Sequence, residues 1–98
     1  MNQPFYRIRI PDEVARLICG LHPHLKKKLK ASLQAILSDP CAGKALKEEL
    51  AGLWSFRVSR FRIIYRMRGT RQIEIIAVGP RERIYEETFK LIRKERRR

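Results

Sequence analysis

The chain has 98 residues, enough for one domain with a modest core and too few for two. Its composition is globular, with 44% hydrophobic and 34% charged residues, but 23 Lys and Arg against 10 Asp and Glu leave a formal charge of +13. Such an excess predicts a polyanionic partner, either a nucleic acid or an acidic protein that covers the basic surface. A basic structural protein without a specific ligand is the alternative.

The two cysteines, Cys19 and Cys41, show no CxxC or Cys/His ligand spacing, which argues against a zinc site. The first fourteen residues lack the apolar core of a signal peptide, and no segment is apolar enough to span a membrane. We therefore expect a cytoplasmic protein with reduced thiols, without membrane association, metal or other cofactor.

Residues 5–10 alternate apolar and polar side chains, which predicts a first strand that ends at Pro11. Asp12 is expected to cap the helix that follows, where apolar residues recur at helical spacing up to residue 21. A second apolar stripe predicts another helix that ends at Asp39-Pro40. The two segments form either a helical hairpin or one long helix kinked near Pro23.

Residues 41–52 are predicted to form a loop or short turn. The alternation then predicts three strands. Ser59-Arg60 and residues 68–71 separate them, and Gly79-Pro80 ends the last strand. Residues 81–98 follow as a C-terminal helix, in which 93–98 form either its end or a flexible basic tail. The expected fold is a single α+β domain over residues 1–98, made of an N-terminal strand, a helical hairpin, a three-stranded antiparallel meander and a C-terminal helix.

The meander is rich in arginine: residues 55–72 hold six arginines and no acidic residue. A two-residue turn at Ser59-Arg60 would place Arg57 directly opposite Arg62. It would also give the sheet one apolar face, expected to meet the helical hairpin and made of Trp54, Phe56, Val58, Phe61, Ile63 and Tyr65.

A second turn over residues 68–71 would pair Arg62 with Ala77 and bring Arg81 to the same end of the sheet, with Tyr85 one helical turn further on. Like charges that face each other across a sheet are unfavourable. Guanidinium groups tolerate this best when a phosphate lies between them, because each can bind it through two parallel hydrogen bonds. The pattern therefore predicts a phosphate site with room beside the small Ala77; a solvated arginine face without a ligand stays open as the alternative.

Two other features of the sequence are candidate sites. His22 and His24 flank Pro23 without a nearby carboxylate or cysteine, which favours a solvated turn over a metal or acid/base site. The lysines of the second helix either bind a phosphate backbone or form a solvated face.

The stretches "LWSFRVSRFRIIYRM" and "IEIIAVGPRERIYEE" resemble the core of the RelE/ParE toxin superfamily, the toxic halves of bacterial toxin–antitoxin pairs. The resemblance covers most of the chain. Proteins of the RelE branch are small basic ribonucleases that enter the ribosomal A site and cut messenger RNA without a metal. The ribose 2′-hydroxyl attacks the adjacent phosphate and expels the 5′-oxygen, which leaves a 2′,3′-cyclic phosphate.

The resemblance implies that Arg57 and Arg62 neutralise the charge that develops on the phosphorane. Arg81 would hold phosphate and assist the leaving oxygen, and Tyr85 would stack on a base or activate the 2′-hydroxyl. Best-matching relatives carry a lysine where this chain has Ser55, which leaves the general base open. Further RNA contacts are assigned to Ser55, Arg60, Arg66, Arg83, Lys26, Lys27, Lys30, Lys44 and Lys47.

The resemblance thus implies a toxin of a type II toxin–antitoxin system that inhibits translation as a ribosome-dependent, metal-independent endoribonuclease. Its expected partners are a cognate antitoxin, the ribosome and mRNA, with operator DNA bound only through the antitoxin complex. Two alternatives stay open: a ParE-like toxin that inhibits DNA gyrase without cleaving nucleic acid, and an RNA-binding relative with weakened catalysis.

Overall fold

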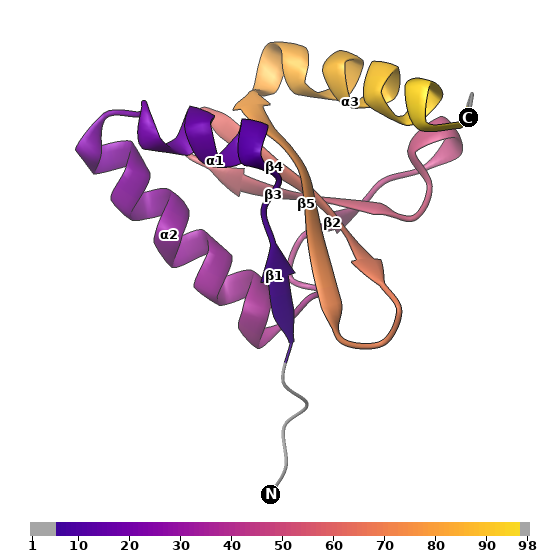
Figure 1. Ribbon diagram of the computed structural model, residues 1–98, viewed down its shortest axis with the longest axis horizontal. Coiled ribbons are helices and arrows are strands. Elements are labelled where there is room, and N and C mark those ends of the chain that lie inside the picture. The colour runs from indigo at the N-terminus through magenta and orange to yellow at the C-terminus, as the bar shows by residue number, and fades with distance from the viewer. Residues whose placement is uncertain (1–5, 97–98) are drawn as a thin grey trace, which may run out of the picture.

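The computed structural model describes residues 6–96, which form a five-stranded sheet and three α-helices (Figure 1). The elements in chain order are β1 (Arg7–Arg9), α1 (Asp12–Cys19), α2 (Pro23–Ser38), β2 (Lys44–Ala45), the 3-10 helix η1 (Glu48–Leu50), β3 (Leu53–Val58), β4 (Phe61–Arg68), β5 (Gln72–Pro80) and α3 (Arg81–Arg96). The predicted α+β class and order are confirmed. β2 and η1 are additions, because both lie in the segment predicted as a loop.

The sheet has the order β1-β5-β4-β3-β2, with β1 parallel to β5 and the other neighbours antiparallel. Helices α1 and α2 pack on one face and α3 on the other (Figure 1). The first core contains Leu29 and Ile36 of α2 against Ile63 and Tyr65, on the face predicted to meet the helices. The second core places Ile84 of α3 and its neighbours against the opposite face. Both sides of the sheet are therefore covered, and functional side chains can be reached only at its ends and edges.

The register of the β3–β4 hairpin is as predicted, with Arg57 paired to Arg62 and Val58 to Phe61. The predicted register of β4 and β5 is wrong: Arg62 pairs with Gly79, and Ala77 lies opposite Ile64. The connecting turn covers only residues 69–71, and a bulge adds a further residue to β5. Ala77 is consequently buried beside α3 and leaves no room at Arg62.

At the helix ends one prediction is corrected, one pair of alternatives is decided, and one residue gains a structural role. Asp12 is the first residue of α1 instead of its N-cap, a position held by Pro11, although its charge still complements the helix dipole. The helical segments form a hairpin, since α1 ends at Cys19 and α2 starts at Pro23. His22 caps α2, because its Nδ1 accepts a hydrogen bond from the His24 backbone N–H at 3.1 Å.

The two ends of the chain differ in part from the prediction. Strand β1 spans three residues of the six predicted, and Phe5 lies outside the described residues. Strand β5 continues through Pro80 instead of stopping before it. Helix α3 includes residues 93–96, and residues 97 and 98 of the proposed tail lie outside the described part.

A buried tyrosine fastens the loop before β2 to the sheet. Tyr65 has no exposed surface; its hydroxyl donates to the Pro40 carbonyl at 2.8 Å and accepts from the Gly43 N–H at 3.1 Å. The loop approaches so closely that a Cβ on Gly43 would lie 2.7 Å from the Tyr65 hydroxyl and 2.9 Å from the Ser55 carbonyl oxygen. Only glycine fits this contact, which sets the short strand β2 against β3.

We predict that Gly43→Ala destabilises the fold by about 1 kcal/mol or more, because the added methyl group displaces backbone. Urea unfolding measures the change. Gly20→Ala is the matched control: Gly20 has a right-handed φ of −85°, and the nearest atom to its Cβ would be 3.7 Å away. Equal stability of the two variants would contradict the close approach.

Burial raises the pKa of the Tyr65 phenol, and the hydrogen bond from Gly43 offsets this only in part. The folded state therefore favours the neutral phenol, and its stability should fall as pH rises from about 10 through the raised pKa.

We predict that Tyr65→Phe loses about 1–2 kcal/mol of stability at neutral pH, because Gly43 and Pro40 lose their hydrogen-bond partner. Its further loss in alkali should be smaller than that of the unmodified chain. Urea unfolding across this pH range checks both, and parallel curves would contradict the assignment.

Candidate phosphate-binding site

A pocket of about 230 Å³ lies at the end of the sheet where the β3–β4 turn meets the start of α3. We call it the arginine pocket; it is lined by Arg57, Ser59, Arg60, Phe61, Arg62, Arg81 and Glu82. The Arg81 backbone N–H donates to the Arg60 carbonyl at 3.0 Å, which fastens the first residue of α3 to the turn. The predicted convergence of Arg57, Arg62 and Arg81 is therefore present, although the register that produces it differs.

The arginine pocket carries four guanidinium groups against one carboxylate. Within residues 6–96, none of the four forms a salt bridge. The Arg62 Nη1 donates to the Ser55 hydroxyl at 3.4 Å, and its buried Nε lacks a hydrogen-bond partner within the described part of the chain. A buried donor without an acceptor is unfavourable. The pocket is thus short of acceptors and suits an anion with several oxygens, such as a phosphate.

Tyr85 reaches this site through Ser55. The two hydroxyl groups lie 3.1 Å apart, and Ser55 is only 1% exposed, so a hydrogen-bonded chain runs from Arg62 through Ser55 to Tyr85. Tyr85 is half-buried at the edge of the second core, one turn into α3. Three of the four predicted catalytic residues therefore line the pocket, and the fourth is linked to it by hydrogen bonds.

The predicted RNA-contacting residues divide by position. Arg60 lines the pocket, and Lys44 pairs with Ser55, so that its side chain projects from the same face of the sheet. Exposed residues elsewhere on the surface are Lys27, Lys30, Lys47 and Arg83, while Lys26 is half-buried on α2.

Arg66 is held elsewhere. It pairs with Glu74 at 2.8 Å and with Glu95 at 3.1 Å. Burial opposes the charge of Arg66, but the hydrogen bonds to these carboxylates outweigh burial and raise its pKa. Its guanidinium connects β4 to the end of α3 and is not part of the arginine pocket.

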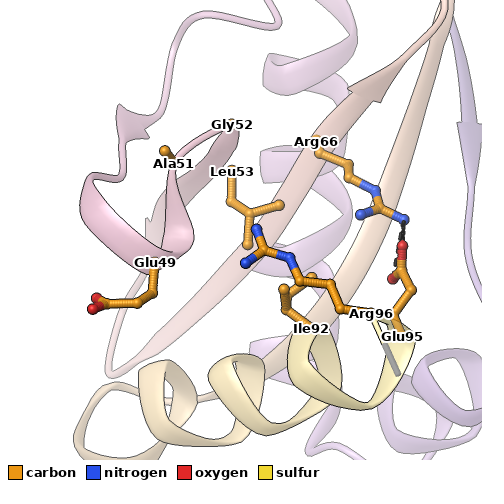
Figure 2. A pocket seen from close by; sticks show the side chains of 8 residues that line it. All are labelled: Glu49, Ala51, Gly52, Leu53, Arg66, Ile92, Glu95 and Arg96. Carbon is orange, nitrogen blue, oxygen red and sulfur yellow. Dashed lines mark hydrogen bonds and ion pairs between the residues drawn. The ribbon is translucent and has the colours of Figure 1, made fainter. Parts of the chain in front are cut away.

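Figure 2 shows a smaller pocket of about 140 Å³ beside this ion pair, between the residues around η1 and the end of α3. Its charged side chains balance, with Glu49 and Glu95 against Arg66 and Arg96. Balanced charge provides no attraction for an anion, so the arginine pocket is the candidate site of this protein.

The sequence did not identify Phe61 or Glu82 as site residues. Phe61 was assigned to the core face, and as the first residue of β4 it lies both against that core and in the pocket lining. Its position directly after the two-residue turn is the sequence feature that could have placed it beside the arginines. Glu82 follows Arg81 directly, so its place in the lining depends on where α3 begins.

Comparison with known proteins identifies the family of this chain. The family model described as ParE toxin of type II toxin-antitoxin system, parDE, matches residues 9–85. The chain therefore belongs to this toxin family, and the RelE/ParE superfamily resemblance is confirmed. No curated protein matches the sequence.

Solved structures share the fold. The toxin–antitoxin complex RelBE2 from Mycobacterium tuberculosis has a chain with 26% identity and a TM-score of 0.68, over 79% of this chain and 99% of that one. A mutant of the Escherichia coli toxin RelE in the free state has 18% identity and a TM-score of 0.72, over 93% and 97%. The archaeal RelE–RelB complex from Pyrococcus horikoshii has 22% identity and a TM-score of 0.68, over 81% and 98%.

Residues 6–96 contain neither a candidate metal-ligand group nor a helix that could span a membrane. This part of the chain has no group of three or more His, Cys, Asp or Glu residues that could hold a metal ion. None of its helices has the length and apolar character needed to cross a membrane.

Proposed function

We propose that this toxin is a ribosome-dependent endoribonuclease that cleaves mRNA in the A site and thereby inhibits translation. The observation that carries the proposal is the arginine pocket, in which Arg57, Arg62 and Arg81 converge without carboxylate partners among residues 6–96. A surface that serves only as a protein contact does not require three guanidinium groups around one small volume. Such a cluster suits the transition state of a phosphodiester, because negative charge accumulates on the phosphorus oxygens.

The reaction assigned to the site is a transesterification within the RNA. The 2′-hydroxyl loses its proton, its oxygen bonds to phosphorus, and the bond from phosphorus to the 5′-oxygen breaks while that oxygen gains a proton. Arg57 and Arg62 stabilise the pentavalent intermediate from the two strands. Arg81 holds the phosphate and the leaving oxygen from the start of α3; since its guanidinium stays charged, it acts electrostatically and not as the acid.

Proton transfer is assigned to the opposite side of the site, where Tyr85 and Lys44 flank Ser55. Tyr85 either stacks on a base or takes the 2′-hydroxyl proton. The register of β2 places Lys44 directly across from Ser55, so the neighbouring strand supplies the cation that position 55 lacks.

The partners follow from the charge and from the solved complexes. A chain of formal charge +13 needs an acidic cover when it is not on the ribosome, and toxins of this fold are seen in complex with antitoxins. We propose a cognate antitoxin that lays an extended or helical segment over the basic surface. Operator DNA would be bound only through that complex, and the site of action is the cytoplasm.

The second candidate is inhibition of DNA gyrase without cleavage. The family model favours it, since the match is to the ParE toxin description.

The first test is in vitro translation of a defined message with the purified chain, with 3′ ends mapped by primer extension. We expect cuts within A-site codons and a roughly hundredfold loss of cleavage rate in Arg62→Ala and Arg81→Ala, because each removes charge from the transition state. Arg71→Ala is the matched control, since this exposed arginine lies at the other end of the β4–β5 hairpin. If the message stays intact and the chain inhibits supercoiling by gyrase, the endoribonuclease proposal is wrong and inhibition of DNA gyrase is supported.

A second test addresses Lys44. We predict that Lys44→Ala lowers the single-turnover cleavage rate at least roughly tenfold, with little change in thermal stability, because the side chain is exposed. Lys44→Arg retains the rate if charge alone is required and loses it if Lys44 transfers a proton. Lys90→Ala removes the same charge from α3 and should leave the rate unchanged. A wild-type rate in Lys44→Ala would exclude the residue from the site.

A further inference from the structure

A third pocket, of about 220 Å³, adjoins the arginine pocket across the β3–β4 turn. We call it the α2-side pocket; it is lined by His22, His24, Leu25, Lys28, Ser59, Arg60 and Phe61. Ser59, Arg60 and Phe61 line both pockets. The start of α2 bounds one pocket and the start of α3 bounds the other, so the turn forms a ridge between two adjoining cavities.

We propose that the α2-side pocket binds the base of the nucleotide next to the phosphate in the arginine pocket. This inference rests on the proposed function, and it names the part of the RNA that the described nuclease site would leave unbound. The occupant is one nucleobase of the same single strand, which passes from one pocket to the other over Arg60.

The lining fits a flat heteroaromatic ring attached to a phosphate. Phe61 and Leu25 are half-buried and present apolar surface, and the rings of His22 and His24 lie beside them at the start of α2. Stacking of bases on aromatic side chains tolerates any base, since every base has a π-face. The sequence preference expected from this pocket is therefore weak.

The charges in the α2-side pocket are of one sign. Lys28 and Arg60 line it and no acidic residue does. Cations at the rim attract the sugar–phosphate backbone on both sides of the base. An apolar side chain of a protein partner would use the ring surface but would gain nothing from these cations, which favours a nucleotide as the occupant.

Hydrogen bonds and the turn conformation hold the backbone on both sides of the α2-side pocket in the free protein. The cap bond from the His24 N–H holds His22, and the Lys26 N–H donates to the His22 carbonyl at 2.9 Å. Across the pocket, Ser59 has a φ of 58°, in the left-handed region that side chains other than glycine seldom adopt. The primed turns of two-residue hairpins require a positive φ, so this conformation belongs to the turn that forms this wall of the pocket.

The test measures binding of a single-stranded RNA tetranucleotide whose 2′-hydroxyl at the cleavage position is replaced by hydrogen, so that it cannot be cut. Parallel oligonucleotides carry one abasic nucleotide at each position in turn. Phe61→Leu keeps an apolar side chain without the ring, and His22→Asn keeps a capping residue without the imidazole. Phe89→Leu, on α3, is the matched loss of a ring away from both pockets.

We expect Phe61→Leu and His22→Asn to raise the Kd of the intact tetranucleotide roughly tenfold, the usual effect of losing one stacked base. For one abasic position, the same substitutions should have no effect, because the base they contact is already missing. Phe89→Leu should bind all the oligonucleotides like the unmodified chain.

Equal weakening of intact and abasic oligonucleotides at every position would overturn the proposal, since the variants would then act through the fold or through charge. Unchanged binding of the intact oligonucleotide would overturn it too, and weakened antitoxin binding alongside would assign the pocket to a protein partner. The oligonucleotide cannot be cleaved, so its binding is independent of catalysis. Base-dependent binding without ribosomal cleavage would therefore contradict the proposed function and leave the α2-side pocket standing.

Discussion

The repulsion between Arg57 and Arg62 is the constraint on which the functional end of the molecule depends. The hairpin register places them directly opposite each other, and among the described residues that line the pocket only Glu82 carries a carboxylate. Two guanidinium groups in this arrangement raise the free energy of the free protein. An anion between them would remove that penalty, so binding of the proposed phosphate would also relieve the repulsion. The rest of the fold keeps this unfavourable pair in place.

Two sets of hydrogen bonds hold the other residues assigned to the site close to that pair. The hydrogen bond from Arg81 to the Arg60 carbonyl fixes the beginning of α3, and therefore the position of Tyr85 one turn later. The buried hydroxyl of Tyr65 holds the loop around Gly43, and that loop sets Lys44 opposite Ser55. The Ser55 hydroxyl links Arg62 of β4 to Tyr85 of α3 by hydrogen bonds, and Lys44 lies opposite Ser55 on β2.

Alternation and turn chemistry predicted the elements well because both are local. The Ser59-Arg60 turn alone was enough to pair Arg57 with Arg62. The β4–β5 register could not be obtained in this way, because it depends on a bulge that no residue type marks. Strand β2 spans two residues and is held by the distant Tyr65, so no periodicity could show it. Arg81 reached the predicted place despite the wrong register, since a shift of two residues along β5 still leaves the end of the strand beside the turn.

The arginines of the meander that looked equivalent in the sequence have two distinct roles. Glu74 lies on β5 opposite Arg66 and pairs with both Arg66 and Arg68, and Glu95 from α3 adds a second partner to Arg66. At this end of the sheet Arg66 and Arg68 thus have carboxylate partners within the chain, and the pair of Arg66 with Glu95 connects β4 to α3. At the other end, no carboxylate among the described residues pairs with Arg57, Arg60 or Arg62. Carboxylates of the chain thus pair with arginines at one end of the sheet and not at the other. This arrangement is expected when the negative charge that balances Arg57, Arg60 and Arg62 comes from a ligand.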